Sequence, residues 1–222
     1  DALNHYESQL WALPKIKTYS LQKSPFLHVD GDVFVWKKFD DALLNSPLIA
    51  QNKDEITSFT GYVQKLEANF SYFPKEIIED RNLNQNVQTF NAGIYGGSDI
   101  AFFKEYTEKA FDFIDKNKLH FKNTDITEFN VIFEQYLFYC MAKSKKKEVS
   151  VLFSKTYKTD EYKGFGDFDK IPFKKQYIHL FSDYKKSEAK CNQMAQRLRL
   201  DYPEYYYKII SIFKKNEQTN LW

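Results

Sequence analysis

The chain has 222 residues, of which 43% are hydrophobic and 18% aromatic, so it can bury a substantial core and is not a disordered protein. Its 32 basic side chains nearly balance its 30 acidic ones, which excludes a global field that would draw the protein to nucleic acid or to a membrane surface. We expect a single domain over residues 1–222, with no membrane span and no signal peptide.

The two cysteines, Cys140 and Cys191, lie in patterns typical of helices, and no second pair is present to complete a zinc site. We therefore expect free thiols, a reducing compartment and a cytoplasmic location. The sequence begins at Asp1 rather than at methionine, so it could be a piece of a longer protein.

Residues 6–23 carry an apolar stripe with helical spacing and are expected to form a helix despite Pro14. The stripe consists of Leu10, Leu13, Ile16 and Tyr19. Lys15 and Lys17 lie on the same helix, and either lysine could reach a phosphate group. The alternative is that each of these lysines simply faces water.

Asp30 and Asp32 flank Gly31 directly after the short apolar run Phe26–Val29. The run follows a proline and is rich in residues that favour strands, so we expect a buried parallel strand. In open α/β sheets ligands bind at the carboxyl ends of the strands, which places both carboxylates at the mouth of a crevice. Gly31 would let a backbone or a ligand approach closely.

Two neighbouring carboxylates repel each other, and burial makes their charge more costly, so we expect a compensating group. Divalent cations such as Mg²⁺ and Mn²⁺ prefer oxygen ligands, and Mg²⁺ usually combines one or two carboxylates with substrate phosphates. Asp30 and Asp32 are therefore candidate metal ligands. The alternative is a strand followed by a polar turn, because Asp-Gly is a common turn pair. The apolar residues Val33–Val35 weigh against a surface hairpin.

Residues 46–51 are predicted to form a short strand, and residues 59–73 an amphipathic helix that ends at Pro74. The stretch 89–99 then contains three of the seven glycines. These glycines, together with Ala92, would let a ligand lie against the backbone, and Ser98 or Asp99 can cap the helix that follows. The spacing does not match the dinucleotide-binding glycine fingerprint, and a tight strand-to-helix turn is the alternative interpretation.

The best helical pattern covers residues 124–142, and its polar residues, among them Asn130, Glu134 and Gln135, are expected mostly to face water. A strand over residues 149–153 is predicted to follow. The polar stretch 156–170 is expected to form a mobile loop over the site.

A second short apolar strand, residues 177–181, carries His179 at its centre and is followed by Lys185 and Lys186. Imidazole is a good ligand for manganese-like ions, and the lysines could hold phosphate oxygens. The alternative is a structural histidine. Helices near residues 185–200 and 203–215 are expected to form a carboxyl-terminal cap within residues 186–222, with the aromatic cluster Tyr202–Tyr207 used in packing.

Five segments of this chain resemble, in the same order, glycosyltransferases of the GT-A fold, in particular bacterial sugar transferases with a D-x-D motif. They are the helix with Lys15, Phe26–Val33, Phe90–Gly97, the helix with Glu134 and Gln135, and Tyr177–Phe181 with the lysines after it. The resemblance covers roughly residues 10–186. It implies an α/β fold class, with a single domain in which helices flank a mixed, mostly parallel central sheet.

The resemblance also implies roles for particular residues. Asp30, Asp32 and His179 would bind a Mn²⁺ or Mg²⁺ cofactor that bridges the diphosphate of a nucleotide-sugar donor, and Glu134 and Gln135 would be the catalytic pair that faces the sugar or acceptor. The residues assigned to substrate binding are Lys15, Gly31, Asn91, Ala92, Gly93, Gly97, Lys185 and Lys186. The acceptor would be a glycan, a lipid-linked sugar, a peptide or a small molecule, and no nucleic acid is expected.

GT-A enzymes begin with a strand and helix that hold the nucleotide base, so we expect that part to lie upstream of Asp1 or to be absent. Two other functions fit parts of the sequence. A phosphatase of the haloacid dehalogenase type also places D-x-D after a buried strand, but it has no use for the stretch Phe90–Gly93. A non-catalytic carbohydrate- or protein-binding module on the same fold is the other alternative.

Overall fold

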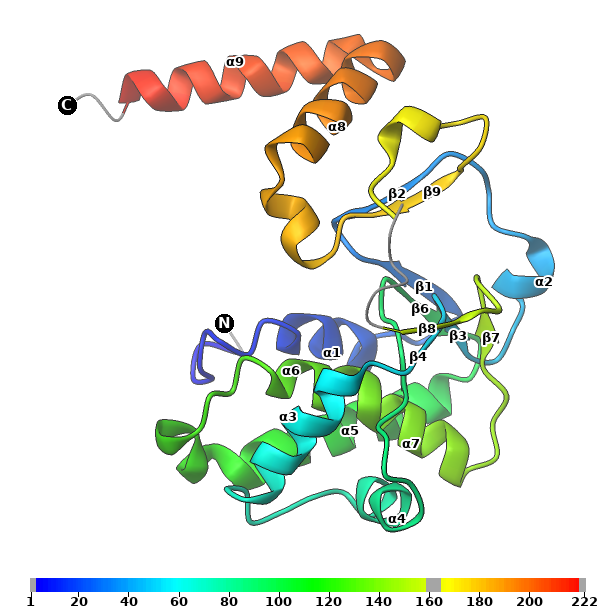
Figure 1. Cartoon of the computed structure of the whole chain (residues 1–222), viewed down its shortest axis with the longest axis vertical. Coiled ribbons are helices and arrows are strands. Elements are labelled where there is room, and N and C mark those ends of the chain that lie inside the picture. Colours follow the sequence, from blue (N-terminus) through cyan, green and yellow to red (C-terminus); the bar gives the residue numbers. More distant parts are fainter. Residues whose placement is uncertain (1–2, 159–164, 220–222) are drawn as a thin grey trace. The chain divides into compact units, whose positions relative to one another are not determined.

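The computed structural model describes residues 3–158 and 165–219 and divides the chain into two compact units (Figure 1). The first unit comprises residues 1–30 and 39–162, and the second comprises residues 31–38 and 163–222. The boundary therefore falls inside the Asp30-Gly31-Asp32 motif. The expected single domain over residues 1–222 stays a prediction.

The first unit is rich in helices, as the periodic apolar spacing of its sequence predicts. Its helices are α1 (Leu13–Ser20), α2 (Asp41–Leu44), α3 (Thr57–Glu67), α4 (Lys75–Leu83), α5 (Ile100–Asn117), the 3-10 helix η1 (Lys118–Asn123), α6 (Phe129–Val131), the π-helical turn η2 (Ile132–Tyr136) and α7 (Leu137–Ser144). The Asp99 side chain caps α5 by accepting a hydrogen bond from the Phe102 N–H at 3.0 Å, which confirms one of the two predicted caps.

Two small sheets complete the first unit. One has the order β1 (Phe26–Val29), β6 (Ile94–Gly97), β3 (Ile49–Ala50), β7 (Ser150–Val151), and the other the order β5 (Thr89–Phe90), β4 (Lys53–Asp54), β8 (Thr156–Tyr157). Among the strands that the structure describes, only β3–β7 and β4–β8 pair in parallel. The mixed α/β class is thus confirmed, whereas the expectation of a mostly parallel sheet is wrong.

The strand β1 has the bounds that the sequence predicts, but it is neither parallel nor buried. It pairs antiparallel with β6 at the edge of its sheet, and Val29 is 37% exposed. An edge strand has a neighbour on one side only, so its side chains are covered less completely than those of a central strand. The carboxyl end of β1 therefore meets the start of β6, with Val29 opposite Ile94.

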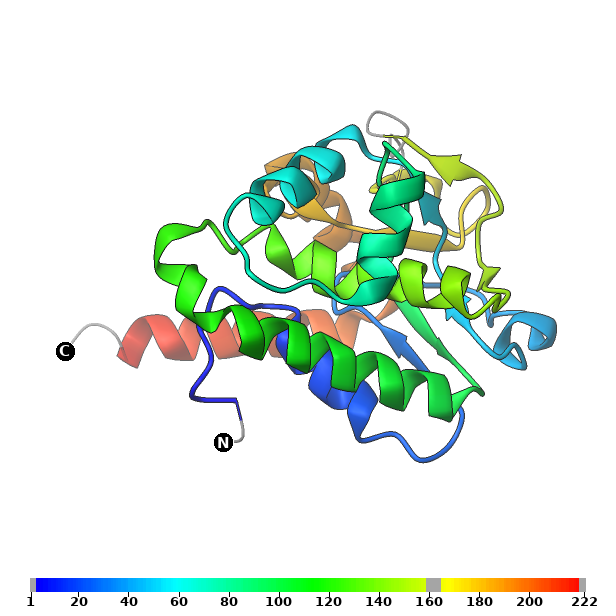
Figure 2. The ribbon, with the colours of Figure 1, turned by 90° about the horizontal axis from the view of Figure 1, so that it is seen from below.

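The core of the first unit is built from aromatic side chains. Phe103 and Tyr106 of α5 pack around Phe138 of α7, and Phe129 and Phe133 extend the same core along the chain. Buried positions recur on α5 every three or four residues, as expected for a helix with one face in the core. The helix α1 lies beside α5 (Figure 2). This packing fixes the helix that carries Lys15.

Two predicted helices have different bounds in the structure. The helix expected to end at Pro74 ends at Glu67, because the Asn117 side chain accepts hydrogen bonds from the N–H groups of Ser71 and Tyr72 and holds that segment in another conformation. Pro74 instead precedes α4. The helix expected over residues 124–142 starts regular α-helical structure only at Phe129 and is interrupted by the π-helical turn.

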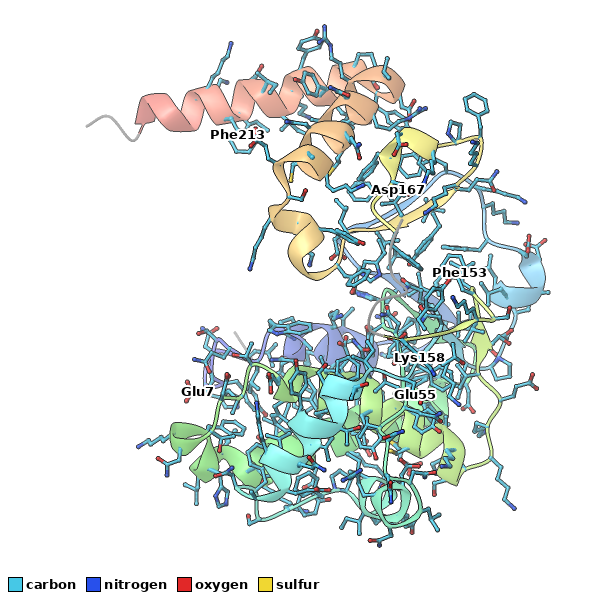
Figure 3. The ribbon with its side chains drawn as sticks, in the orientation of Figure 1. Glu7, Glu55, Phe153, Lys158, Asp167 and Phe213 are labelled. Atoms are coloured by element: carbon cyan, nitrogen blue, oxygen red, sulfur yellow. The ribbon has the colours of Figure 1, made fainter. Side chains whose placement is uncertain are left out.

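Among its described residues, the second unit contains one antiparallel strand pair, β2 (Val33–Val35) with β9 (Tyr177–His179). Its other elements are the 3-10 helices η3 (Phe168–Lys170) and η4 (Ser182–Lys186) and the helices α8 (Glu188–Asp201) and α9 (Pro203–Thr219). A small apolar cluster of Phe168, Ile171, Ile178 and Leu180 forms its core. Asp167, labelled in Figure 3, accepts hydrogen bonds from Lys170 and Lys190 and so ties η3 to α8.

The two predicted carboxyl-terminal helices are confirmed as α8 and α9. The expectation that the cluster Tyr202–Tyr207 is used in packing is wrong for Tyr202, Tyr205 and Tyr207, each of which is about half exposed. The predicted loop over residues 156–170 contains β8 and η3, and its middle, residues 159–164, lies outside the described residues. No helix within residues 3–158 and 165–219 combines the length and the apolar character needed to cross a membrane.

Replacing Gly96 by alanine is expected to destabilise the first unit by about 1–3 kcal/mol, because an added Cβ would clash with the backbone of β1. That Cβ would meet the Phe26 carbonyl oxygen and would lie 2.8 Å from the Leu27 Cα. Gly61→Ala on α3 is the matched control, since its Cβ would meet nothing within 4 Å and alanine favours helices. Urea unfolding should show a loss of stability for Gly96→Ala and a small gain for Gly61→Ala. Equal stabilities would contradict the close pairing of β1 and β6.

Candidate functional site

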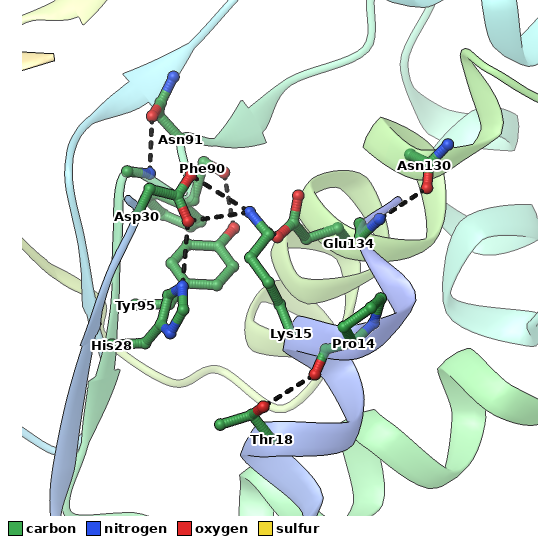
Figure 4. A network of polar contacts seen from close by, with 12 residues as sticks. Pro14, Lys15, Thr18, His28, Asp30, Phe90, Asn91, Tyr95, Asn130 and Glu134 are labelled. Carbon is green, nitrogen blue, oxygen red and sulfur yellow. Dashed lines mark hydrogen bonds and ion pairs between the residues drawn. The ribbon is translucent and has the colours of Figure 1, made fainter. Parts of the chain in front are cut away.

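In the first unit, four ionisable side chains from three parts of the chain meet in one network, here called the Lys15 cluster (Figure 4). Lys15 Nζ lies 3.1 Å from Asp30 Oδ1 and 2.6 Å from Glu134 Oε1. His28 Nε2 lies 3.0 Å from Asp30 Oδ1. A single lysine therefore bridges two carboxylates, and a histidine contacts one of them.

The local structure explains how Asp30 is placed. It follows β1 directly, and its backbone N–H donates a hydrogen bond to the Gly93 carbonyl at 3.0 Å. The turn that carries this carbonyl is held by Asn91, whose side-chain oxygen accepts from the Gly93 N–H at 3.0 Å. The structure thus brings Asn91, Ala92 and Gly93 next to Asp30. This proximity agrees with their assignment to one site, although it does not test that assignment.

Glu134 lies on the π-helical turn η2 and is fully buried. The expectation that most polar groups of this helix face water is therefore wrong for Glu134 and for Asn130. The Asn130 side chain accepts a hydrogen bond from the Ala12 N–H at 2.9 Å and so fixes the start of α1 against α6, directly before the π-helical turn. Single π-helical turns inside α-helices occur frequently at functional sites.

The two carboxylates that flank Lys15 have opposite pKa shifts. Burial raises the pKa of Glu134, and Lys15 only partly opposes that rise. Burial also acts to raise the pKa of Asp30, but the hydrogen bond from His28 and the charge of Lys15 outweigh it and lower that pKa. Burial acts to lower the pKa of Lys15, yet the Glu134 and Asp30 carboxylates raise it overall. Divergent pKa values of neighbouring acids are typical of sites where two carboxyl groups have different roles.

A second cluster lies in the second unit, where Asp32 meets His179 and Lys185. His179 Nε2 lies 3.5 Å and Lys185 Nζ 2.5 Å from the Asp32 carboxylate. The strand pairing places them: Val33 is opposite His179, and the Leu180 N–H donates to the Asp32 carbonyl at 2.9 Å. Burial acts to raise the pKa of Asp32, but His179 and Lys185 outweigh it and hold this pKa well below its usual range. Sequence positions far apart thus converge on one carboxylate.

Both carboxylates of the D-x-D motif have a lysine and a histidine partner from the chain itself. Asp30 is paired with Lys15 and His28, and Asp32 with Lys185 and His179. The predicted need for charge compensation is therefore met by side chains, and charge alone does not demand a metal ion. The prediction of a metal ion depends instead on the donor atoms. The carboxylates of Asp30 and Asp32 and the imidazole of His179 are groups that Mn²⁺ accepts as ligands.

Other predicted site residues lie in different settings. A Cβ at Gly31 would meet nothing within 4 Å, so no close backbone approach requires this glycine. Gly97 has a φ of +136° and lies opposite Phe26, at the end of β6 away from Asp30, where an added Cβ would clash with the Pro47 carbonyl. Its requirement for glycine is thus explained by the fold. Lys186 is exposed, and Gln135 is partly buried.

Sequence reasoning assigned no role to His28. The spacing of His28 and Asp30 could have indicated their contact. Side chains two residues apart along extended backbone point to the same side, and His28 precedes Asp30 by two positions. Its bond to Asp30 adds the imidazole that completes the Lys15 cluster.

These features define a mixed α/β protein with a D-x-D motif whose two aspartates each bind lysine and histidine side chains. The chain belongs to a family of unknown function, DUF6734, whose family model matches residues 1–212. No curated protein and no solved structure matches this chain.

Proposed function

We propose that this protein is a metal-dependent glycosyltransferase that moves a sugar from a nucleotide-diphosphate sugar to an acceptor. The observation that carries the proposal is the convergence of His179 and Lys185 on Asp32 in the second unit. These are the residue types that the D-x-D transferase pattern calls for, and they come from a segment far along the chain. The free thiols Cys140 and Cys191 support a cytoplasmic location.

In this proposal Asp32 and His179 bind Mn²⁺ or Mg²⁺, and Asp30 joins them on the strength of the D-x-D spacing. When bound, the cation would neutralise the charge of the diphosphate leaving group. Lys185 is more than half exposed and pairs with Asp32 through a single ion pair, so it can exchange that carboxylate for a diphosphate oxygen without losing a charged partner. Lys186, which is also exposed, remains the alternative phosphate contact.

Glu134 and Gln135 were expected to face the sugar or acceptor. Because Glu134 is fully buried and ion-paired with Lys15, we assign it a positioning role: it holds the Lys15 ammonium beside Asp30. Gln135 keeps the proposed role of contacting sugar or acceptor. Asn91, Ala92 and Gly93 would line the donor sugar beside Asp30, consistent with the bond from the Asp30 N–H to Gly93.

A panel of UDP- and GDP-sugars, tested with and without manganese, would check this proposal. We expect one donor to raise the melting temperature, because a ligand that binds only the folded state stabilises it by mass action. Manganese should be required, and the same donor should release its nucleoside diphosphate over time. Binding without release would instead identify a non-catalytic module, and a folded protein that binds no donor with either metal would contradict the proposal.

Replacing His179 by alanine is expected to raise the manganese concentration needed for donor binding by about tenfold, a smaller loss than that of an aspartate ligand. His120→Ala is the matched control, because this imidazole contacts only the Ser71 hydroxyl and the Phe70 ring among the contacts recorded for it. Manganese titration of the donor-induced rise in melting temperature would measure both variants. An unchanged requirement in His179→Ala would remove this buried histidine from the proposed ligand set.

A further inference from the structure

The proposed function leaves His28 of the Lys15 cluster without a role. Its Nε2 atom lies 3.0 Å from Asp30 Oδ1, and both residues belong to the first unit (Figure 4). An ionised carboxylate can only accept hydrogen bonds, so Nε2 carries the proton in this contact and His28 is the donor. His28 therefore acts on the carboxylate that begins the D-x-D motif.

The two oxygens of the Asp30 carboxylate are unequally engaged. Oδ1 accepts hydrogen bonds from His28 and from Lys15 Nζ, the latter at 3.1 Å. Among the contacts within residues 3–158 and 165–219, Oδ2 accepts from Lys15 alone, at 3.2 Å. A carboxylate oxygen has two lone pairs. Both lone pairs of Oδ1 are thus used by the chain, whereas one lone pair of Oδ2 stays available to a ligand.

His28 is itself held in place by its surroundings. Its backbone lies in β1, where it is paired with Tyr95 of β6. Its ring packs edge-on against the ring of Tyr19, with the centroids 5.2 Å apart and the planes at 74°, and Tyr19 is buried. A donor fixed by a strand and by a buried ring can hold its acceptor in one orientation.

The position of this hydrogen bond in the chain indicates what it does. His28 and Asp30 are two residues apart, so the bond joins no distant segments and adds little to the tertiary structure. The contact that ties Asp30 to another element is the ion pair with Lys15 of α1. The effect of His28 is therefore on the orientation of the Asp30 side chain.

We propose that His28 is a positioning residue for the metal ion: it occupies Oδ1 of Asp30 and leaves Oδ2 as the oxygen that binds the cation. This inference rests on the proposed function, which assigns Asp30 as a metal ligand. Carboxylates that bind metal ions are themselves hydrogen-bonded, and losing such a partner typically costs about 10- to 100-fold in metal affinity.

Manganese titrations of the donor-induced rise in melting temperature, with the full chain, test this inference. His28→Phe keeps a ring beside Tyr19 but removes the donor, and it should raise the manganese concentration at half-saturation by about tenfold. His28→Leu, which is smaller, should give the same loss. His28→Gln restores an N–H donor of similar reach and should recover most of the affinity. His120→Phe is the matched control, because His120 bonds to the Ser71 hydroxyl rather than to a carboxylate, and it should need no extra manganese.

The failure of this inference can be told apart from the failure of the proposed function. If donor binding by the natural chain requires manganese but His28→Phe and His28→Leu need no more of it, the inference is overturned and the proposed function stands. If His28→Gln binds manganese as weakly as His28→Phe, then His28 does not act by donating to Asp30, and the inference is again overturned. A natural chain that binds no donor with either metal contradicts the proposed function, and the inference falls with it.

Discussion

Asp32→Asn is expected to reduce manganese-dependent donor binding by at least about 100-fold, the largest functional effect of any single change proposed for this chain. Changing a residue that only hydrogen-bonds to a metal ligand already costs about 10- to 100-fold in metal affinity, and Asp32 is a proposed direct ligand. The substitution keeps the size of the side chain but removes the charge that the metal requires. Titration of manganese and donor against the melting temperature would measure the loss.

The fold of Asp32→Asn should survive, which separates a functional loss from an unfolded protein. Lys185, the shortest contact of the Asp32 carboxylate, is 55% exposed, so the lost ion pair should cost no more than about 1 kcal/mol. Asp169→Asn is the matched control, since Asp169 is an exposed acid of the same unit. Unchanged manganese-stimulated binding in Asp32→Asn, with normal binding in the control, would remove Asp32 from the ligand set.

Local sequence was sufficient to predict where the D-x-D motif sits in the fold. The apolar run Phe26–Val29 became a strand with the expected bounds, because a short run rich in strand-favouring residues between a proline and an Asp-Gly pair has few other conformations available. The pairing of that strand was not predictable in the same way. Its partner β6 lies far along the chain, and the sequence Phe26–Val29 does not determine whether that partner runs parallel or antiparallel to it.

The burial and the ion pair of Glu134 in the Lys15 cluster could not be predicted from sequence patterns. Helical spacing identified the helix around Glu134 but could not show a π-helical turn, which shifts the buried face by one residue relative to a regular helix. The partner that makes burial of Glu134 tolerable is Lys15, from the other end of the first unit's sequence. A buried acid is rare unless it is paired, and the local sequence around Glu134 does not reveal its partner, so an exposed position was the expectation.

Lys15→Met is expected to destabilise the protein by about 3–5 kcal/mol, the largest loss of stability predicted here, because it leaves Glu134 buried without its cation. Urea unfolding near neutral pH would measure the change in free energy. Lys17→Met on the same helix is the matched control, because no ion pair among residues 3–158 and 165–219 includes Lys17; its effect should stay within about 0.5 kcal/mol.

The pH dependence of Lys15→Met gives the more specific test. Burial already raises the pKa of Glu134, and removing Lys15 takes away the charge that opposes this rise. The folded state then holds a proton on Glu134 at pH values where the unfolded chain has released it. The contribution of Glu134 to stability should therefore be greatest below the ordinary pKa of a glutamate and should fall as the pH rises toward the raised pKa of the folded state. In the natural chain the contribution of Glu134 should show the same trend over a narrower range of pH, because Lys15 partly opposes the rise of its pKa.

The double variant Lys15→Met/Glu134→Leu tests whether the unpaired Glu134 carboxylate causes the loss of stability. Replacing both members of a buried ion pair by apolar side chains of similar size is often neutral or stabilising, so most of the stability lost in Lys15→Met should return. The part of the pH dependence that comes from Glu134 should disappear with its carboxyl group. If the double variant is as unstable as Lys15→Met and keeps the same pH slope, then the loss comes from the ion pair between Lys15 and Asp30 rather than from an unpaired Glu134.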